Sequence, residues 1–240
     1  MYHYICEKSI CEAVEASLRA LQEYGIDRTR ENQDRKDIVK ETQLVIDVTE
    51  PLSEPAVSKA MPADINMLVQ YEDEFLNGSS DDKGWEYTYH ALYSPFYPKV
   101  LNELKRNLNS RRACIALGQG DINFTPDPPC LQLLMFVQAD GALELTCVFR
   151  SNDGVKAFAM NICAIAALQR KAAADLGLNV GQLHYIANNF HAYSKDFDLL
   201  KTYIATFDKY SDKEHLWRKS YSWAQHEAAE KKYYSAKENK

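Results

Sequence analysis

The strongest constraint on the fold is a pair of apolar segments that meet at Asp140-Gly141. Residues 131–137 and 143–149 flank this dipeptide, and Asp-Gly between two such segments is the strongest short-range signal for a β-hairpin. Residues 155–176 then read as a long, alanine-rich apolar helix, with Gly177 as its end signal. The spacing therefore predicts two paired strands followed by a central helix.

Weaker periodic patterns mark the other elements. Apolar residues at helical spacing predict further helices at 10–24, 64–76 and 97–107. Short apolar runs predict further strands at 42–49, 112–117 and 183–186. Residues 25–40 are dense in charge, so we expect a charged loop leading into the sheet. Because no repeat or linker interrupts residues 1–240, we expect a single domain, with 209–240 as a peripheral helical tail.

Composition narrows the class of protein. A chain of 240 residues with 46% hydrophobic side chains is long enough to bury a sizeable core. Its formal charge of −6 argues against bulk nucleic-acid binding, so any phosphate site must be local. The N-terminal segment has acidic residues and no long apolar run, which predicts a cytoplasmic protein without a membrane span. The six cysteines lack metal-ligand spacing, so we expect most to be reduced and buried and expect no metal.

A series of short strings follows in one order along the chain. They are SRR at 110–112, PPC at 128–130, RSND at 150–153, MN at 160–161 and HAY at 191–193. Alone, a cysteine after two prolines is more often structural than catalytic. The ordered series, however, resembles the active-site series of thymidylate synthases and related pyrimidine-nucleotide hydroxymethylases over about residues 85–200. The resemblance implies folate-dependent one-carbon transfer to a pyrimidine nucleotide.

We expect an α+β fold, with a mixed, twisted sheet covered by helices on one face. The resemblance implies that the open face packs against a second subunit to form a homodimer. Arg111 and Arg112 would then reach across the interface to the substrate phosphate, because guanidinium groups suit phosphate oxygens. Arg35 is a further candidate phosphate ligand. Alone, the arginine pair would be equally well explained as solvated charge.

The resemblance makes Cys130 the nucleophile. C5 of uracil takes up a one-carbon unit only after a nucleophile has added to C6, which makes C5 electron-rich. A reactive thiol needs positive neighbours that lower its pKa, and Arg150 is the candidate. Arg150 and Ser151 would also hold the nucleotide phosphate. Without the ordered series, Arg150 would be read as a surface charge at a strand end.

Three more positions receive roles from the resemblance. The carboxamide of Asn161 can pair with O4 and N3–H of uracil, whereas cytosine-specific relatives carry aspartate, so a uracil nucleotide is favoured. His191 and Tyr193 lie on the same side of an extended segment and would hold a ribose hydroxyl. Asp153 would bind the pterin ring of the folate, and it is also placed to cap the helix that follows.

The sequence departs from the family pattern at several positions. Leu131 stands where histidine usually follows the nucleophile, and Phe149 stands where glutamine usually precedes the RS pair. Glu72 is our choice for the acid on the folate side, and the sequence ends in SAKENK, which differs from a small apolar terminus.

Three functions remain open. The first is dUMP methylation with 5,10-methylenetetrahydrofolate or a related reduced pterin, which a drier pocket around Leu131 and Phe149 would favour. The second is hydroxymethylation of a pyrimidine nucleotide by water addition to the same intermediate. The third is a nucleotide-binding relative without turnover.

Overall fold

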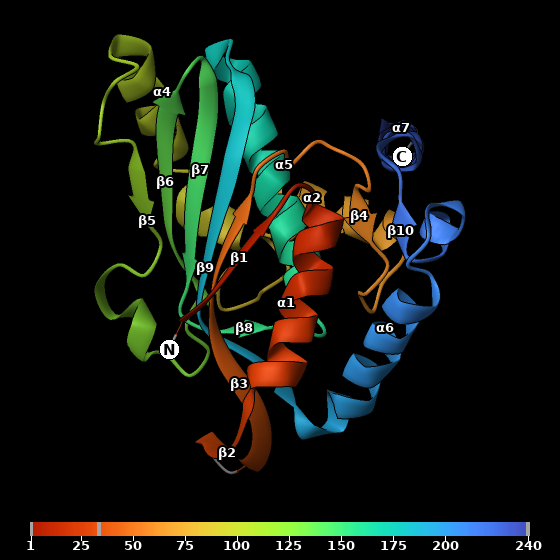
Figure 1. Cartoon of the computed structure of the whole chain (residues 1–240). Helices are drawn as coiled ribbons and strands as arrows, with labels where there is room; N and C mark the ends of the chain where they lie inside the picture. The colour runs from red at the N-terminus through yellow and green to blue at the C-terminus, as the bar shows by residue number, and fades with distance from the viewer. Residues whose placement is uncertain (1, 33–34, 239–240) are drawn as a thin grey trace.

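One mixed sheet forms the framework of the molecule (Figure 1). In residues 2–32 and 35–238, which the computed structural model describes, eight strands pair in the order β1-β3-β9-β7-β6-β5, with β2 beside β3 and β8 beside β9. The strands of this sheet are β1 (Tyr2–Glu7), β2 (Ile26–Asn32), β3 (Arg35–Val48), β5 (Cys114–Ala116), β6 (Leu131–Ala139), β7 (Ala142–Phe149), β8 (Asn152–Asp153) and β9 (Asn179–Tyr193). The pairs β1–β3, β7–β9 and β8–β9 are parallel and the others are antiparallel. A two-stranded ribbon pairs β4 (Val57–Ser58) with β10 (Ser220–Tyr221).

The helices gather on one face of the sheet (Figure 1). They are α1 (Ile10–Tyr24), α2 (Ile65–Asn77), α3 (Tyr89–Tyr93), α4 (Tyr97–Arg106), α5 (Phe158–Leu176), α6 (Phe197–Lys209) and α7 (Trp223–Glu238). Helix α1 packs on β1 and β3, and α5 packs on β7 and β9. The strand residues that face these helices are apolar and fully buried, among them Leu44, Ile46, Leu145 and Leu183. The predicted α+β fold, with a mixed sheet covered on one face, is confirmed.

Local signals placed several element boundaries correctly. Asp140 and Gly141 both have positive φ angles, 49° and 81°, as the tight turn between β6 and β7 requires. The Asp64 side chain accepts hydrogen bonds from the backbone N–H groups of Asn66 and Met67, so it caps α2. Gly177 ends α5 in the left-handed conformation, at φ 68°. Residues typical of turns and helix caps are therefore the most reliable local signals in this sequence.

The charged segment after α1 is a hairpin, so the prediction of a loop at residues 25–40 is wrong. Strands β2 and β3 pair along their length here, although their residues are mostly charged. The cross-strand charges complement one another: Glu41 accepts from Arg28 at 2.9 Å and from Arg30 at 2.5 Å, and Lys40 lies 2.8 Å from Asp27. Opposite charges on facing strands thus stabilise pairing without apolar alternation.

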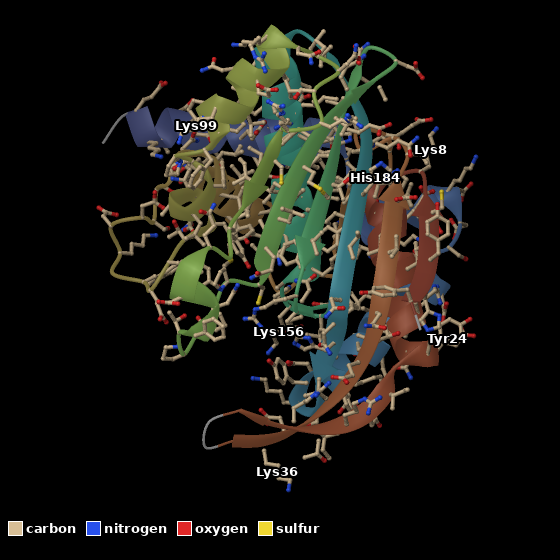
Figure 2. The ribbon with its side chains drawn as sticks, turned by 90° about the vertical axis from the view of Figure 1, so that its left-hand side faces the viewer. Lys8, Tyr24, Lys36, Lys99, Lys156 and His184 are labelled. Atoms are coloured by element: carbon tan, nitrogen blue, oxygen red, sulfur yellow. The ribbon has the colours of Figure 1, made fainter. Side chains whose placement is uncertain are left out.

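The face of the sheet that carries no helices is visible in Figure 2. Its centre is polar, because His184 Nδ1 lies 2.6 Å from Asp47, and the Tyr4 hydroxyl donates to Asp47 at 2.7 Å. Tyr4 is 64% exposed and Val137 at the other side is 46% exposed. This surface therefore leaves aromatic and aliphatic side chains open to solvent on a single chain.

Two general expectations about the chain can be compared with the structure. All six cysteines are free thiols, but only three of them, Cys11, Cys147 and Cys163, are buried, so the expectation that most are buried is wrong. Helices of the length and hydropathy that crossing a membrane requires are absent from the described residues.

Candidate functional site

The β6–β7 hairpin brings Cys130 and Arg150 together, because each residue adjoins the paired ends Leu131 and Phe149. The backbone N–H of Arg150 donates to the carbonyl of Cys130 at 2.9 Å. Its guanidinium donates through Nε to the carbonyl of Pro129 at 3.0 Å and through Nη2 to that of Pro128 at 2.5 Å. Arg150 therefore fixes the rigid Pro-Pro turn that presents the half-buried thiol.

The surroundings of Cys130 have opposing effects on the pKa of its thiol. Burial raises the pKa of the Cys130 thiol, Arg150 opposes the rise and Asp127 adds to it. The predicted influence of Arg150 has the right sign, but burial outweighs it. The thiol is consequently protonated at neutral pH in the free protein.

Ser151, His191 and Tyr193 meet where β8 runs beside the end of β9. The Ser151 hydroxyl lies 3.5 Å from His191 Nδ1, and the rings of His191 and Tyr193 have centroids 5.1 Å apart. Burial lowers the pKa of His191, although Asp153 opposes this change. His191 is therefore neutral at pH 7 and offers one donor and one acceptor nitrogen.

Asp153 does not cap α5, because the N-cap residue is Ala157 and it receives no side-chain hydrogen bond. Oδ1 of Asp153 accepts hydrogen bonds from the backbone N–H groups of Val155 and Lys156, both at 3.0 Å. These bonds shape the turn that leads into α5. Oδ2 has no hydrogen-bond partner among the described residues, so it is available to a ligand.

Asn161 lies on the first turn of α5 and is 7% exposed. Its Oδ1 accepts a hydrogen bond of 2.6 Å from the Tyr71 hydroxyl on α2. Tyr71 is not among the site residues predicted from the sequence, because on this helix only carboxylates are considered and the next residue, Glu72, is selected. Its spacing to Phe75, one helical turn later, was the signal that could have placed it on the ligand-facing side.

An aromatic cavity of about 260 Å³ opens beside this pair. Its walls are five aromatic side chains, three carboxylates and two hydroxyl side chains: Tyr71, Phe75, Trp85, Tyr87, Tyr89, Glu74, Glu86, Asp127, Ser80 and Thr88. Tyr71 belongs both to the cavity wall and to the hydrogen bond with Asn161. The cavity is thus suited to a flat ring with N–H donors at its edge.

Leu131 and Phe149, the two departures from the family pattern, lie in the core. Both have 0% exposure, and Phe149 stacks on Tyr185 with ring centroids 4.8 Å apart. Neither lines the aromatic cavity. Phe149 contacts the wall residue Tyr89 from behind, with ring centroids 6.4 Å apart, and the expectation that these two residues make the nucleotide pocket drier stays a prediction.

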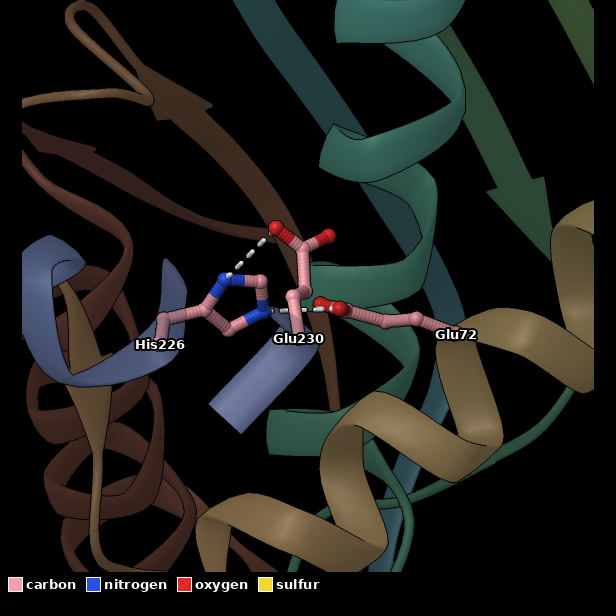
Figure 3. Close-up of side chains that lie close together, drawn as sticks. All are labelled: Glu72, His226 and Glu230. Atoms are coloured by element: carbon pink, nitrogen blue, oxygen red, sulfur yellow. Dashed lines mark hydrogen bonds and ion pairs between the residues drawn. The ribbon is translucent and has the colours of Figure 1, made fainter. Parts of the chain in front are cut away.

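Glu72, the sequence-based choice for the acid on the folate side, points towards α7 and does not line the aromatic cavity. Its carboxylate lies 2.7 Å from Nε2 of His226, on α7, while His226 Nδ1 lies 3.8 Å from Glu230 (Figure 3). The Arg170 guanidinium binds Glu230 at 3.1 Å and so balances part of the negative charge. All three side chains in Figure 3 have groups that metal ions can bind, within 4.8 Å of one another. In this arrangement they attach α7 to α2.

The neighbouring acid, Asp73, strengthens the same attachment. It is fully buried and accepts from Tyr233 at 3.0 Å, Tyr234 at 3.2 Å and Lys237 at 2.7 Å, all on α7. Burial alone would raise the pKa of Asp73, but hydrogen bonds from Lys237, Asn77 and Tyr233 outweigh it and lower the pKa to about 2. Residues two apart on a helix differ by about 200°, so Asp73 faces away from Tyr71.

The lowered pKa of Asp73 predicts acid sensitivity. The associated stability is present above the unfolded-state pKa of about 4 and is lost as pH falls towards 2, which amounts to about 2 kcal/mol. Asp73→Asn should therefore lower the free energy of unfolding at pH 7, and the gap to wild type should shrink by about this amount at pH 2. Urea denaturation at a series of pH values measures it, with the exposed Asp198→Asn as control. A gap that does not change with pH would contradict the assignment.

The structure does not bring the candidate arginines to Cys130 within one chain. The carbonyl of Ala113 accepts a hydrogen bond from the N–H of Phe136 on β6. Because β5 and β6 are antiparallel, Arg111 and Arg112, which precede Ala113, lie farther from Cys130 than Phe136 does. Phe136 is six residue steps along the extended chain from Cys130, a distance of about 20 Å. Arg35 begins β3, and its side chain lies outside the described part of the structure.

The chain is similar in sequence to proteins of one family. A family model described as thymidylate synthase matches residues 96–227. A protein of Methanocaldococcus jannaschii named "Putative thymidylate synthase" is 29% identical over 180 residues, which are 69% of this chain and 81% of that protein. The deoxyuridylate hydroxymethyltransferase of Pseudomonas phage M6 is 27% identical over 146 residues, or 55% of this chain and 40% of that protein.

Among solved structures, thermostable thymidylate synthase A from Bacillus subtilis has a similar fold. Its TM-score is 0.65 at 16% identity, and the match covers 83% of this chain and 85% of that chain. At this identity, the similarity establishes the fold alone. The family match spans more than half of the chain and includes Cys130, Arg150 and Asn161. This chain therefore belongs to the thymidylate synthase family of one-carbon transferases.

Proposed function

We propose that the protein converts dUMP to dTMP, with Cys130 adding to C6 of the uracil ring. The main support is that one thiol, one carboxamide able to pair with a base and one aromatic cavity lie around the same end of the sheet. Cys130 adjoins Arg150, and the Tyr71–Asn161 pair borders the cavity. A nucleotide needs the first two features and a flat second substrate needs the third.

The nucleotide would lie between Cys130 and Asn161. Attack by the thiolate on C6 forms the C–S bond and moves the ring electrons to C5 and O4, so that C5 can bond to the one-carbon unit. Loss of the C5 proton would then break the bond between the one-carbon unit and the carrier amine and leave a methylene group at C5. Addition of hydride to this methylene group would return electrons to the ring, so that the C–S bond breaks and the thiolate is released. Arg150 favours the thiolate electrostatically and, with Ser151, supplies donors for the phosphate. His191 and Tyr193 would contact the sugar.

The second substrate would be 5,10-methylenetetrahydrofolate or a related reduced pterin. It supplies the methylene group and the hydride that together become the methyl group, leaving the dihydro form. The aromatic walls of the cavity suit stacking on a pterin, and the free Oδ2 of Asp153 can accept from a pterin N–H. Burial raises the pKa of Cys130, so the thiol must lose its proton when the substrates bind.

A homodimer is part of this proposal. Arg111 and Arg112 are exposed and about 20 Å from Cys130 along their own chain, so they would serve a phosphate only in a partner subunit. The helix-free sheet face, with its exposed Tyr4 and Val137, is the surface that a second copy would cover.

Hydroxymethylation of dUMP is the second candidate. Two observations favour it: similarity to a deoxyuridylate hydroxymethyltransferase, and the attachment of α7 to the side of α2 that faces away from Tyr71. A tail held there leaves the cavity open to water, which can add to the C5 methylene group in place of hydride. In that case the tetrahydro form of the carrier is returned.

The deciding experiment incubates purified protein with 5-fluoro-dUMP and methylenetetrahydrofolate and analyses it by intact-protein and peptide mass spectrometry. We expect one covalent adduct per chain, on the peptide containing Cys130. Turnover of dUMP should yield dTMP and dihydrofolate. A 5-hydroxymethyl product with tetrahydrofolate would select the second candidate. Nucleotide binding without adduct or product would leave a relative that binds nucleotide without turnover.

A further inference from the structure

Tyr71 makes a single polar contact with a residue that has a proposed role in recognising the base. Its hydroxyl donates to Oδ1 of Asn161 at 2.6 Å, and it has no other hydrogen-bond partner among the described residues. Nδ2 of Asn161 forms no hydrogen bond within that part of the chain. We infer that Tyr71 is a specificity-determining residue, which selects uracil over cytosine by fixing the orientation of the Asn161 carboxamide. This inference rests on the proposed function.

The Tyr71 hydroxyl has the properties of a permanent donor. Burial raises its pKa, and the nearby Glu74, Tyr87 and Cys130 add to the rise, so the hydroxyl keeps its proton at every physiological pH. The proton is directed at Oδ1. If the carboxamide turned over, Nδ2 would face the hydroxyl and the proton would lose its acceptor. An unpaired buried donor costs about 1–3 kcal/mol, so the observed orientation is favoured.

This orientation matches uracil and opposes cytosine. Oδ1 has a second lone pair that can accept from N3–H of uracil, while Nδ2 can donate to O4. Cytosine presents an unprotonated N3 and a donor amino group at C4, and it would therefore need the carboxamide turned by 180°. Because asparagine alone can adopt either orientation, Asn161 discriminates only if a neighbour fixes it. Tyr71 occupies the position to do so.

The test compares wild type with Tyr71→Phe, which keeps the ring and removes the hydroxyl. Dissociation constants for dUMP and dCMP are measured by calorimetry, so that the readout does not depend on turnover. We expect wild type to prefer dUMP and the ratio of the two constants to fall about tenfold in Tyr71→Phe. Tyr185→Phe is the matched control, because the Tyr185 hydroxyl makes the same kind of bond to Oδ1 of Asn152, at 2.9 Å.

Further measurements distinguish an effect on the orientation of Asn161 from a general loss of nucleotide binding. In an Asn161→Ala protein, Tyr71→Phe should leave the dUMP-to-dCMP ratio unchanged, because Tyr71 acts through Asn161. Equal weakening of both nucleotides by Tyr71→Phe in the wild-type background would overturn the inference, and so would an equal loss of the ratio in Tyr185→Phe. If wild type binds dUMP but forms no adduct, the proposed reaction fails while the ratio test still stands. Wild type that binds neither nucleotide overturns both.

Discussion

Cys130→Ser is expected to abolish the covalent adduct with 5-fluoro-dUMP and to lower the turnover of dUMP at least about a thousandfold. Serine keeps the size of the side chain, but its hydroxyl is a much weaker nucleophile at neutral pH. The fluorine at C5 cannot leave as a proton does, so an adduct formed by wild type persists. Intact-protein mass spectrometry measures the adduct, and a tritium-release assay at C5 measures turnover.

The control for this variant is Cys114→Ser. Cys114 is an exposed thiol on β5, where it pairs with Met135, five residues along the chain from Cys130. It should retain adduct formation and turnover, which shows that loss of a thiol alone has no effect. Nucleotide affinity should also survive in Cys130→Ser, because the phosphate and base contacts remain. An unchanged adduct yield in Cys130→Ser would remove Cys130 from the mechanism.

Asn161→Asp should reverse the preference for the base. A carboxylate offers no donor to O4 of uracil, whereas its protonated form pairs with N3 and the amino group of cytosine. A site built to hydrogen-bond one edge rejects the other strongly, so the ratio of kcat/KM for dCMP to that for dUMP should rise at least about a hundredfold. The Tyr71 hydroxyl can still donate to the new carboxylate. Competition kinetics with both nucleotides measure the ratio.

Asn152→Asp controls for the chemistry of this substitution. Asn152 is 2% exposed and also accepts from a tyrosine hydroxyl, that of Tyr185. Placing a carboxylate there should leave the ratio of dCMP to dUMP turnover as in wild type, whatever its effect on stability. If Asn161→Asp left the ratio unchanged as well, a different group would read the base.

Local signals determined how much of the fold could be predicted from sequence. The Asp140-Gly141 turn, the Asp64 cap and the Gly177 end each depend on one or two residues, and the structure has all three as expected. The pairing of β2 with β3 depends on complementary charges that lie more than ten residues apart, such as Arg30 and Glu41. No window of the sequence around either residue reveals that their side chains form an ion pair.

The candidate site shows the same difference between residues that local signals identify and residues that depend on long-range packing. Cys130 and Arg150 could be paired from sequence because a short hairpin separates them, and Asn161 followed at a fixed distance. The side of α2 on which Glu72 lies could not be predicted, because a helix turns by about 100° per residue and neither face of α2 is uniformly apolar. Tyr71 lines the cavity, whereas the next residue, Glu72, contacts α7.

The attachment of α7 to α2 affects how the protein is best handled in the laboratory. Purification tags are often fused to the C-terminus, and here such a fusion would pull on a helix that is bound to Glu72 and Asp73. Those acids share a helical turn with Tyr71, so a strained tail could alter measured kinetic constants without any change in the catalytic groups. Comparison of a protein with a cleavable tag before and after cleavage would separate the properties of the enzyme from those of the fusion.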